Sequence, residues 1–254
     1  MDIRFDNKVI IVTGASKGIG RATAIEFAKS GGSVVVNYNR SEKEAKEVLS
    51  LIKSESNSAI IVKADVSKRS EVDRLIQITK DKFGEKIDIL VNNAGSMIER
   101  RLFKDMSEDL WDQCMEVNLK SVYLCSQAVI PTMKQNGFGR IINLSSIAAR
   151  NGGSLGSSHY SASKAAVLNF TKNLAKELVG TGITVNGVAP GVITTPFHDK
   201  FTSQEARAKL NRMIPLGREG TPEEIAYAIL FLASEYANYI VGETIEINGG
   251  MLMD

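Results

Sequence analysis

The sequence predicts an α/β protein with a doubly wound parallel sheet of about seven strands and helices on both faces. Short apolar runs rich in Val and Ile alternate along the chain with longer stretches of helical period. Nearly all of these runs are apolar on both faces, as in parallel strands covered by helices on both sides. The 254 residues, 43% of them hydrophobic, contain no Pro/Gly/Ser-rich linker and no repeat, so we expect a single domain over residues 1–254.

The strands are expected at residues 9–13, 34–37, 60–64, 87–92, 141–145, 184–189 and 244–247. The helices between them are expected at residues 18–30, 42–55, 70–83, 107–135, 158–179 and 222–234. The stretch 192–215 contains Pro196 and Pro215 and shows no sheet pattern. We therefore expect a loop or a small helical lid there, next to the substrate site.

The composition narrows the class of protein. The chain has 31 basic and 29 acidic residues, and this near balance gives no basis for a nucleic-acid or membrane partner. No apolar run reaches the about 18–20 residues of a membrane-spanning helix. Residues 1–8 carry charges where a signal peptide is apolar, so a cytoplasmic protein is expected. Cys114 and Cys125 lie in a helical pattern without metal-ligand spacing, which predicts free thiols and no metal site.

A glycine-rich turn follows the first expected strand and opens the first expected helix. Gly14, Gly18 and Gly20 have the spacing GxxxGxG. Glycine allows a tight turn and lets the backbone approach a pyrophosphate at the N-terminus of a helix. A plain tight turn would explain an isolated glycine triad, but the strand–turn–helix context favours a dinucleotide site. The contacts expected from this turn are Gly14, Ser16, Lys17, Gly18, Ile19 and Gly20.

The end of the second strand bears on which dinucleotide binds. An NAD site usually places Asp or Glu there, about 20 residues after the glycines. This chain has Asn37, Tyr38, Asn39 and Arg40 instead, and a carboxylate that would repel a 2′-phosphate is absent. Together with Lys17, Arg40 favours NADP over NAD, with Tyr38, Asn39 and Arg40 as contacts. The alternative is that Lys17 and Arg40 are ordinary solvated cations.

Further motifs occur in order along the chain: Asp65-Val66, Asn92-Asn93-Ala94-Gly95, Asn118, Ser145-Ser146, Tyr160-Ser161-Ala162-Ser163-Lys164 and Pro190-Gly191 through Thr195. With the glycine turn, they resemble the short-chain dehydrogenase/reductase family over residues 8–253. The resemblance implies a Rossmann-type fold, a nicotinamide cofactor and hydride transfer to or from a carbonyl group. The tail around Pro215-Leu216-Gly217-Arg218 and Asn248-Gly249-Gly250 is similar to that of 3-oxoacyl-[acyl-carrier-protein] reductases.

Tyr160 and Lys164 are four residues apart in an expected helix, so they share one face. The pKa of an unperturbed tyrosine is about 10, too high for a base at neutral pH. A nearby ammonium group favours the phenolate, so we expect Lys164 to lower the pKa of Tyr160. Tyr160 is then the general acid in carbonyl reduction and the base in the reverse reaction. The alternative is an ordinary, half-exposed helix pair.

Two serines compete for the role of hydrogen-bond donor to the substrate oxygen. Ser145 and Ser146 end an expected strand, and neighbours on a strand point to opposite faces, so only one can serve. In the family the second serine of such a pair is the catalytic one. We therefore expect Ser146 to stabilise the developing alkoxide, with one residue inserted in 152–158, and Ser145 to be structural.

The remaining site residues rest on the resemblance alone. It implies that Asn118 holds a water linked to Lys164, and that Lys164 also binds the nicotinamide ribose. Asp65, for which a helix N-cap role is the alternative, would lie beside the adenine, although Ser67 or Ser70 is better placed as the cap. For the carboxamide, Thr194 is the alternative to the Thr195 hydroxyl. The implied cofactor contacts are Asp65, Val66, Asn92, Ala94, Gly95, Tyr160, Lys164, Pro190, Gly191, Ile193 and Thr195.

The substrate expected from the resemblance is a 3-oxoacyl thioester, reduced by NADPH. The chain departs from the family at Gly137 and Thr181, where well-known members carry the basic residues that dock acyl-carrier protein. The alternatives are a sugar or polyol 1-dehydrogenase and a binding protein without turnover. His159 could line the substrate pocket, but we expect it to pack or hydrogen-bond at the pocket rim. His198 lies in the expected lid, and neither histidine is expected to bind a metal. The apolar stretch 225–247 and the chain end at 248–253 resemble family segments that pair subunits, so we expect a homotetramer.

Overall fold

The computed structural model describes residues 2–54 and 58–253, and within them the strands form one seven-stranded, all-parallel sheet. The strand order is β3-β2-β1-β4-β5-β6-β7. The strands are β1 (Val9–Val12), β2 (Ser33–Tyr38), β3 (Ala59–Lys63), β4 (Ile89–Asn92), β5 (Gly139–Leu144), β6 (Ile183–Pro190) and β7 (Thr244–Ile247). The predicted fold class is confirmed, and all seven expected strands are present.

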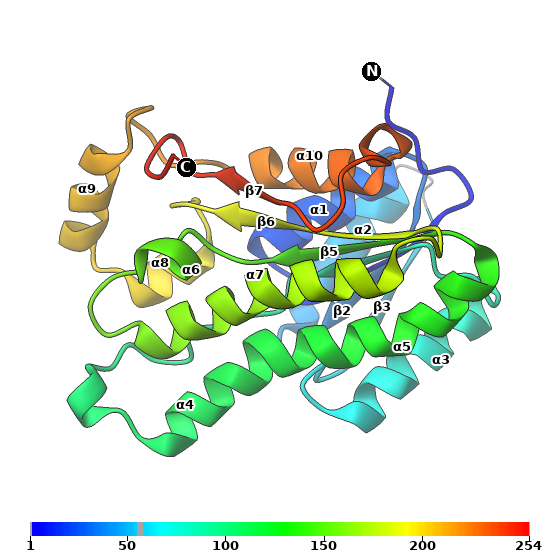
Figure 1. Ribbon diagram of the computed structural model, residues 1–254. Helices are drawn as coiled ribbons and strands as arrows, with labels where there is room; N and C mark the ends of the chain where they lie inside the picture. Colours follow the sequence, from blue (N-terminus) through cyan, green and yellow to red (C-terminus); the bar gives the residue numbers. More distant parts are fainter. Residues whose placement is uncertain (1, 55–57, 254) are drawn as a thin grey trace.

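Helices cover both faces of the sheet (Figure 1). One face packs against α1 (Gly18–Lys29), α2 (Glu42–Ser54) and α10 (Pro222–Ala233). The other packs against α3 (Arg69–Phe83), α5 (Ser121–Asn136) and α7 (Ser158–Leu178). In β1, Ile10 and Val12 enter the first core layer and Ile11 the second, because successive side chains alternate between faces. This two-sided burial explains why the strands read as continuous apolar runs.

The expected helix at 107–135 is wrong as a single element. It divides into α4 (Glu108–Met115), one turn of π-helix (Glu116–Lys120) and α5. The π turn contains Asn118, whose amide donates to the carbonyl oxygen of Cys114 and so competes with the regular ladder. The expected helix at 42–55 ends in the structure at Ser54, and its last residue lies outside the described part of the chain.

The stretch 192–215 forms two short helices, α8 (Pro196–Phe201) and α9 (Gln204–Met213), and α6 (Ala148–Asn151) follows β5. Figure 1 shows α8 and α9 standing beyond the carboxyl end of β6. In this position they adjoin the end of the sheet at which ligands bind in doubly wound folds. The described residues contain no helix long and apolar enough to cross a membrane.

Candidate active site

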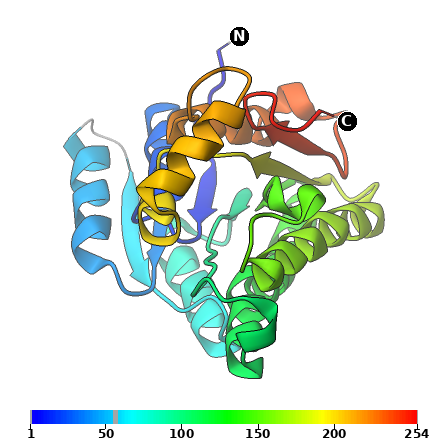
Figure 2. The same cartoon turned by 90° about the vertical axis from the view of Figure 1, so that its left-hand side faces the viewer.

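The strand order reverses between β1 and β4, and this reversal positions the site. In such sheets a crevice opens outside the carboxyl ends of the two strands on either side of the reversal. Figure 2 views the molecule from this end. The glycine turn after β1 and the Asn92–Gly95 segment after β4 flank the crevice. A Cβ on Gly14 would lie 3.0 Å from the Cα of Ala94, so the two turns are in contact.

Side chains from neighbouring strands hold the glycine turn in shape. The amide of Asn93 donates to the carbonyl oxygens of Thr13 (2.8 Å) and Gly14 (3.0 Å). The Oδ1 of Asn37 accepts the N–H of Gly14 at 3.2 Å. Gly14 has φ +61°, a left-handed conformation that favours glycine. A Cβ on Gly20 would lie 2.4 Å from the amide nitrogen of Asn93, so a larger residue there would displace the amide that supports the turn.

The N-terminus of α1 fits a phosphate. Lys17, at the N-cap position, has an extended backbone and supplies no side-chain cap. The first N–H groups of the helix are therefore not satisfied by a capping side chain and can bind an anion. Gly18 brings this helix end against Thr195, whose Cγ2 would lie 3.3 Å from a Cβ on Gly18. The pyrophosphate end and the expected carboxamide contact are thus neighbours, which suits a dinucleotide lying across the crevice.

The end of β2 presents two exposed residues and one buried one. The Tyr38 side chain is only 6% exposed and belongs to the core with α1 and α2, whereas Asn39 and Arg40 are exposed. Lys17 forms an ion pair with Glu44 at 2.8 Å. Arg40 makes no ion pair within residues 2–54 and 58–253. Arg40 is therefore the cation at this strand end that remains available to a ligand.

Lys164 lies beside Tyr160 on α7 and is almost fully buried, with 4% exposure. Its Nζ donates to the carbonyl oxygen of Leu144 at 2.7 Å and lies 5.8 Å from the centroid of the Tyr160 ring. Burial lowers the pKa of Lys164 to about 8. Burial also raises the pKa of Tyr160 to about 12, although a hydrogen bond with Ser146 acts in the opposite direction. The expected lowering of the Tyr160 pKa by Lys164 is therefore wrong for this structure, because desolvation dominates.

The two serines after β5 have separate roles. The Ser145 hydroxyl donates to the carbonyl oxygen of Lys164 at 2.9 Å and is buried, so it joins the strand to α7. The Ser146 hydroxyl accepts the N–H of Ala148 at 3.1 Å, and its interaction with the Tyr160 hydroxyl acts to lower the pKa of Tyr160. Ser146 is therefore the serine that faces Tyr160.

Asn118 is fully buried and uses its side chain to hold the segment after β4. Its Nδ2 donates to the carbonyl oxygens of Ser96 (2.7 Å) and Cys114 (2.8 Å), and its Oδ1 accepts the N–H of Ser96 at 3.0 Å. A Cβ on Gly95 would lie 2.7 Å from this Oδ1 and 3.2 Å from the Nζ of Lys164. Gly95, Asn118 and Lys164 therefore converge on one point.

Two expected cofactor residues also have structural roles. The Asn92 amide lies inside the sheet and donates to Asn143 Oδ1 (2.8 Å) and Ser126 Oγ (3.1 Å). One carboxylate oxygen of Asp65 accepts from the N–H and hydroxyl of Ser67. The alternative N-cap role of Asp65 is wrong, and neither Ser67 nor Ser70 caps α3, because Lys68 occupies the N-cap position and no side chain caps the helix. Val66 is buried in the core.

The segment after β6 is fixed to its neighbours before it reaches the crevice. The N–H of Gly191 donates to the carbonyl oxygen of Ile247 at 2.9 Å, and Ile193 pairs with Gly220. Thr194 donates to Glu219 at 2.9 Å, whereas Thr195 lies against Gly18. Of the two threonines, Thr195 is therefore the one beside the glycine turn; its methyl group faces Gly18, and its hydroxyl donates to the carbonyl oxygen of Ile193 at 3.3 Å.

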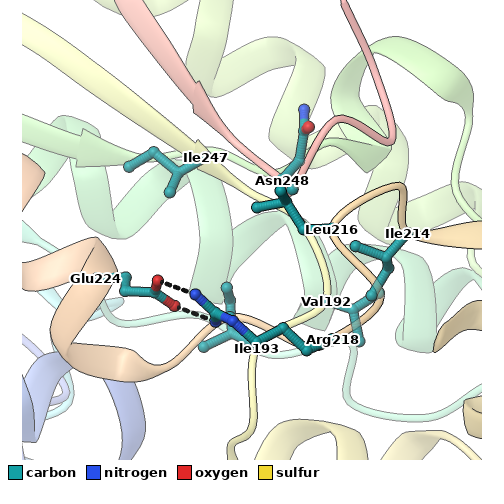
Figure 3. A pocket seen from close by; sticks show the side chains of 10 residues that line it. Val192, Ile193, Ile214, Leu216, Arg218, Glu224, Ile247 and Asn248 are labelled. Carbon is teal, nitrogen blue, oxygen red and sulfur yellow. Dashed lines mark hydrogen bonds and ion pairs between the residues drawn. The ribbon is translucent and has the colours of Figure 1, made fainter.

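A small cavity of about 90 Å³ lies next to this segment (Figure 3). Mostly apolar side chains line it, including Val192, Ile193 and Ile214, and the bidentate ion pair of Arg218 with Glu224 lies among them. Ser146, Tyr160 and Lys164 are not among its lining residues. The cavity is therefore separate from the catalytic cluster.

Sequence reasoning missed an aromatic wall beside the catalytic tyrosine. The ring of Phe197 in α8 lies 5.5 Å from that of Tyr160 and 4.9 Å from that of Phe201 (centroid distances). The spacing of Phe197 and Phe201, four residues apart, is the one signal that could have indicated it. Of the two histidines, His159 is buried, with Nε2 bonding the carbonyl oxygens of Met97 and Glu99. His198 lies in α8, its Nδ1 3.2 Å from the Thr202 hydroxyl.

A doubly wound parallel sheet, a glycine turn at a helix N-terminus, and partly exposed Ser146 and Tyr160 beside a buried Lys164 define a dinucleotide-dependent oxidoreductase. A family model described as enoyl-(acyl carrier protein) reductase matches residues 14–252. The chain belongs to the short-chain dehydrogenase/reductase family, which uses a nicotinamide cofactor.

Curated relatives match the chain over almost its full length. A 3-oxoacyl-[acyl-carrier-protein] reductase of Synechocystis sp. is 45% identical over 97% of both chains. Proteins of the same name from Staphylococcus epidermidis and Staphylococcus aureus are 42% identical over 97% of this chain, and over 100% and 98% of their own.

Proposed function

We propose that the protein uses NADPH to reduce the 3-oxo group of an acyl thioester. The observation that carries this proposal is the pairing of the Ser146 and Tyr160 hydroxyls at the carboxyl end of β5, beside the buried Lys164. Two hydroxyl donors on one side of a crevice suit a carbonyl oxygen that becomes an alkoxide. The names of the relatives give the substrate class.

The bound cofactor supplies the hydride, and the protein's residues supply position and a proton. Ser146 donates a hydrogen bond to the substrate oxygen and stabilises the developing negative charge. Tyr160 then transfers its proton to that oxygen, since a pKa of about 12 keeps the hydroxyl protonated at neutral pH. Lys164 binds the nicotinamide-ribose hydroxyls, and the π turn at Asn118 links it through water to solvent. Phe197 closes the crevice over the Tyr160 ring.

The remaining cofactor contacts follow the length of the crevice. The turn formed by Gly14, Ser16, Lys17, Gly18, Ile19 and Gly20 would hold the pyrophosphate. Asn39, Arg40 and Asp65 would hold the adenosine half, together with Tyr38 and Val66, whose side chains lie in the core and would leave only their main chain for contact. The residues that would hold the nicotinamide half are Asn92, Ala94, Gly95, Pro190, Gly191, Ile193 and Thr195.

Arg40 selects NADPH in this proposal, because it lies exposed directly after β2 and residues 37–40 include no acidic residue. Arg40→Gln should lower kcat/KM for NADPH about tenfold or more and leave the value for NADH within about twofold. Lys17→Gln should act less strongly, because Lys17 already pairs with Glu44. Equal activity of wild type with both cofactors would overturn the NADP assignment.

The reaction is tested by following NADPH oxidation with acetoacetyl thioesters. Crotonyl thioesters test the enoyl reduction named in the family model, and NADP reduction with an aldose panel tests a sugar dehydrogenase. We expect turnover with acetoacetyl thioesters alone. Sugar oxidation without thioester reduction would overturn the proposed substrate, and the absence of turnover with every carbonyl would leave a binding protein.

The proposal also includes a single domain over residues 1–254, with α8 and α9 as the lid, in a cytoplasmic homotetramer. Much of the apolar stretch at 225–247 is used within one chain, because α10 packs its side chains into the core. A groove of about 530 Å³ remains on the opposite helices, lined by Met115, Leu119, Tyr123, Phe170 and charged neighbours. Tyr227 on α10 and Met253 at the chain end are also exposed. Light scattering that shows a monomer at micromolar concentration would refute the tetramer.

A further inference from the structure

Arg100 stands out because it is a partly buried cation without an acidic partner. It lies in the connection between β4 and α4, and burial lowers the pKa of its guanidinium. Within the described residues, no carboxylate forms an ion pair with it. Removing a charge from water without a counter-charge is unfavourable, so such a group is expected where a ligand supplies the charge.

The neighbouring acids are already used by other cations. Glu99 pairs with Arg101, the next residue along the chain. Asp199 in the lid and Glu219, which follows the lid in the chain, both pair with Arg207, at 2.5 and 2.6 Å. The Glu99–Arg101 pair is neutral, and Asp199, Glu219 and Arg207 together carry one negative charge, but among the described residues none of these carboxylates forms an ion pair with Arg100.

Three hydrogen bonds fix the direction of the guanidinium. Its Nε donates to the carbonyl oxygen of Phe201 in α8 at 3.0 Å. Its Nη1 donates to the hydroxyl of Ser154 (2.8 Å) and the carbonyl oxygen of Leu155 (2.7 Å). These three N–H groups are satisfied, and the two N–H groups of Nη2 make no hydrogen bond to residues 2–54 or 58–253. A planar guanidinium with one free nitrogen can donate two hydrogen bonds to an oxyanion.

The place of Arg100 in the fold indicates where that anion lies relative to the reaction. Phe201 contacts Phe197, and Phe197 contacts Tyr160, so the aromatic wall separates Arg100 from the reacting centre. Ser154 and Leu155 belong to the loop between α6 and α7, which leads into the helix that carries Tyr160. An anion on Arg100 is therefore remote from the carbonyl and belongs to the arm that carries the acyl group.

We infer that Arg100 binds the phosphate of a phosphopantetheine arm at the mouth of the crevice, between the lid and the loop at 152–157. This inference rests on the proposed thioester substrate. It also provides a cation at the mouth in a chain that has Gly137 and Thr181 where well-known family members carry basic docking residues. The same phosphate occurs in coenzyme A thioesters and in carrier-protein thioesters.

The test measures binding without turnover, so that it stands apart from the activity assay. Phosphopantetheine and pantetheine, which differ by the phosphate, are titrated calorimetrically into the protein saturated with NADP. Wild type should bind phosphopantetheine about tenfold or more tightly than pantetheine, and Arg100→Gln should remove this difference. Arg101→Gln, which removes the adjacent charge, should preserve it. Equal binding of the two ligands by wild type would overturn the inference.

A second variant distinguishes phosphate binding by Arg100 from a purely structural role in which Arg100 only holds the lid. Ser154→Ala removes one bond that holds the guanidinium but leaves the charge, so it should preserve most of the discrimination. Loss of affinity for both ligands in Arg100→Gln, with unchanged discrimination between them, would mean that Arg100 only holds the lid.

The kinetic arm identifies the source of the phosphate. Arg100→Gln should raise KM about tenfold for acetoacetyl-coenzyme A, for the acetoacetyl carrier protein, or for both, and leave KM for acetoacetyl-N-acetylcysteamine, which has no phosphate, unchanged. A rise in KM for only one of the two thioesters identifies that thioester as the source of the phosphate, and a rise for both means that Arg100 binds the phosphate of either. If wild type reduces no thioester, the proposed function fails, and the calorimetric result still decides whether Arg100 binds the phosphate.

Discussion

Buried charged side chains have different partners at the two ends of the parallel sheet. At the amino end, Asp88 precedes β4 with a side chain only 1% exposed, and it faces Lys8 (3.6 Å) and Lys86 (3.4 Å) and accepts the N–H of Val9 (2.8 Å). At the carboxyl end, Lys164 is buried as deeply, but its contact is a neutral carbonyl oxygen. The charge of Asp88 at the amino end is paired, whereas the ammonium group of Lys164 at the carboxyl end is buried without an acidic partner among the described residues, which is unfavourable for stability.

The largest effect is expected at the carboxyl end and concerns rate. Tyr160→Phe removes the proton donor and leaves the ring packed against Phe197, so kcat for carbonyl reduction should fall about 10²–10⁴-fold. The melting temperature and the affinity for NADPH should change little. Stopped assays with acetoacetyl thioester, thermal melts and cofactor titration measure the three quantities. Wild-type turnover in this variant would show that the mechanism is wrong.

At the amino end the same kind of change should affect stability and not rate. Asp88→Ala leaves the N–H of Val9 without its acceptor and two lysines without their shared partner, so the free energy of unfolding should fall by about 2–3 kcal/mol. Urea unfolding measures the loss. Asp88→Asn, which keeps an acceptor, should lose less. A large fall in kcat for the folded Asp88→Ala protein would contradict the division between the two ends.

The charge state of Lys164 predicts a pH dependence of stability. Its pKa is lowered to about 8 in the folded protein from the ordinary 10.5, so between these values the unfolded state binds more protons. Stability from this group therefore rises as the pH increases from 8 towards 10.5 and is constant below 8. Relative to Lys164→Met, wild type should gain about 2 kcal/mol between pH 8 and 10.

Urea unfolding of both proteins at several pH values checks this window. Subtracting the variant removes contributions from other groups, including Tyr160, whose raised pKa lowers stability only above its ordinary value of 10. Lys172→Met, an exposed lysine of the same helix, is the matched control. A constant difference between wild type and Lys164→Met across the window would show that Lys164 is not desolvated.

The sequence predicts the features that depend on local pattern. The seven strands, the glycine turn and the helix carrying Tyr160 and Lys164 follow from apolar runs and from spacing along the chain. It does not predict the π turn, because the hydrogen bonds of Asn118 to Cys114 and Ser96 depend on where the segment after β4 lies in the fold. Arg100 gives no sequence signal, since its partners Ser154 and Phe201 are 54 and 101 residues away. Desolvation of Tyr160 is likewise a property of the assembled core.

The smallest effect is expected for a single cation of the amino-end cluster. Lys8 shares Asp88 with Lys86, and its ammonium lies 3.7 Å from the centroid of the Phe138 ring, with Arg140 4.3 Å from the same centroid. The Lys8 side chain is 25% exposed, Lys86 also pairs with Asp88, and Arg140 also lies over Phe138. Lys8→Met should therefore lower the free energy of unfolding by less than about 1 kcal/mol. In Lys86→Met the remaining Lys8 should act as the substitute, so the double variant should lose more than the sum of the single losses. Additive losses would mean that the cations do not share Asp88, and the pairing that distinguishes this end of the sheet would then rest on the N–H of Val9 alone.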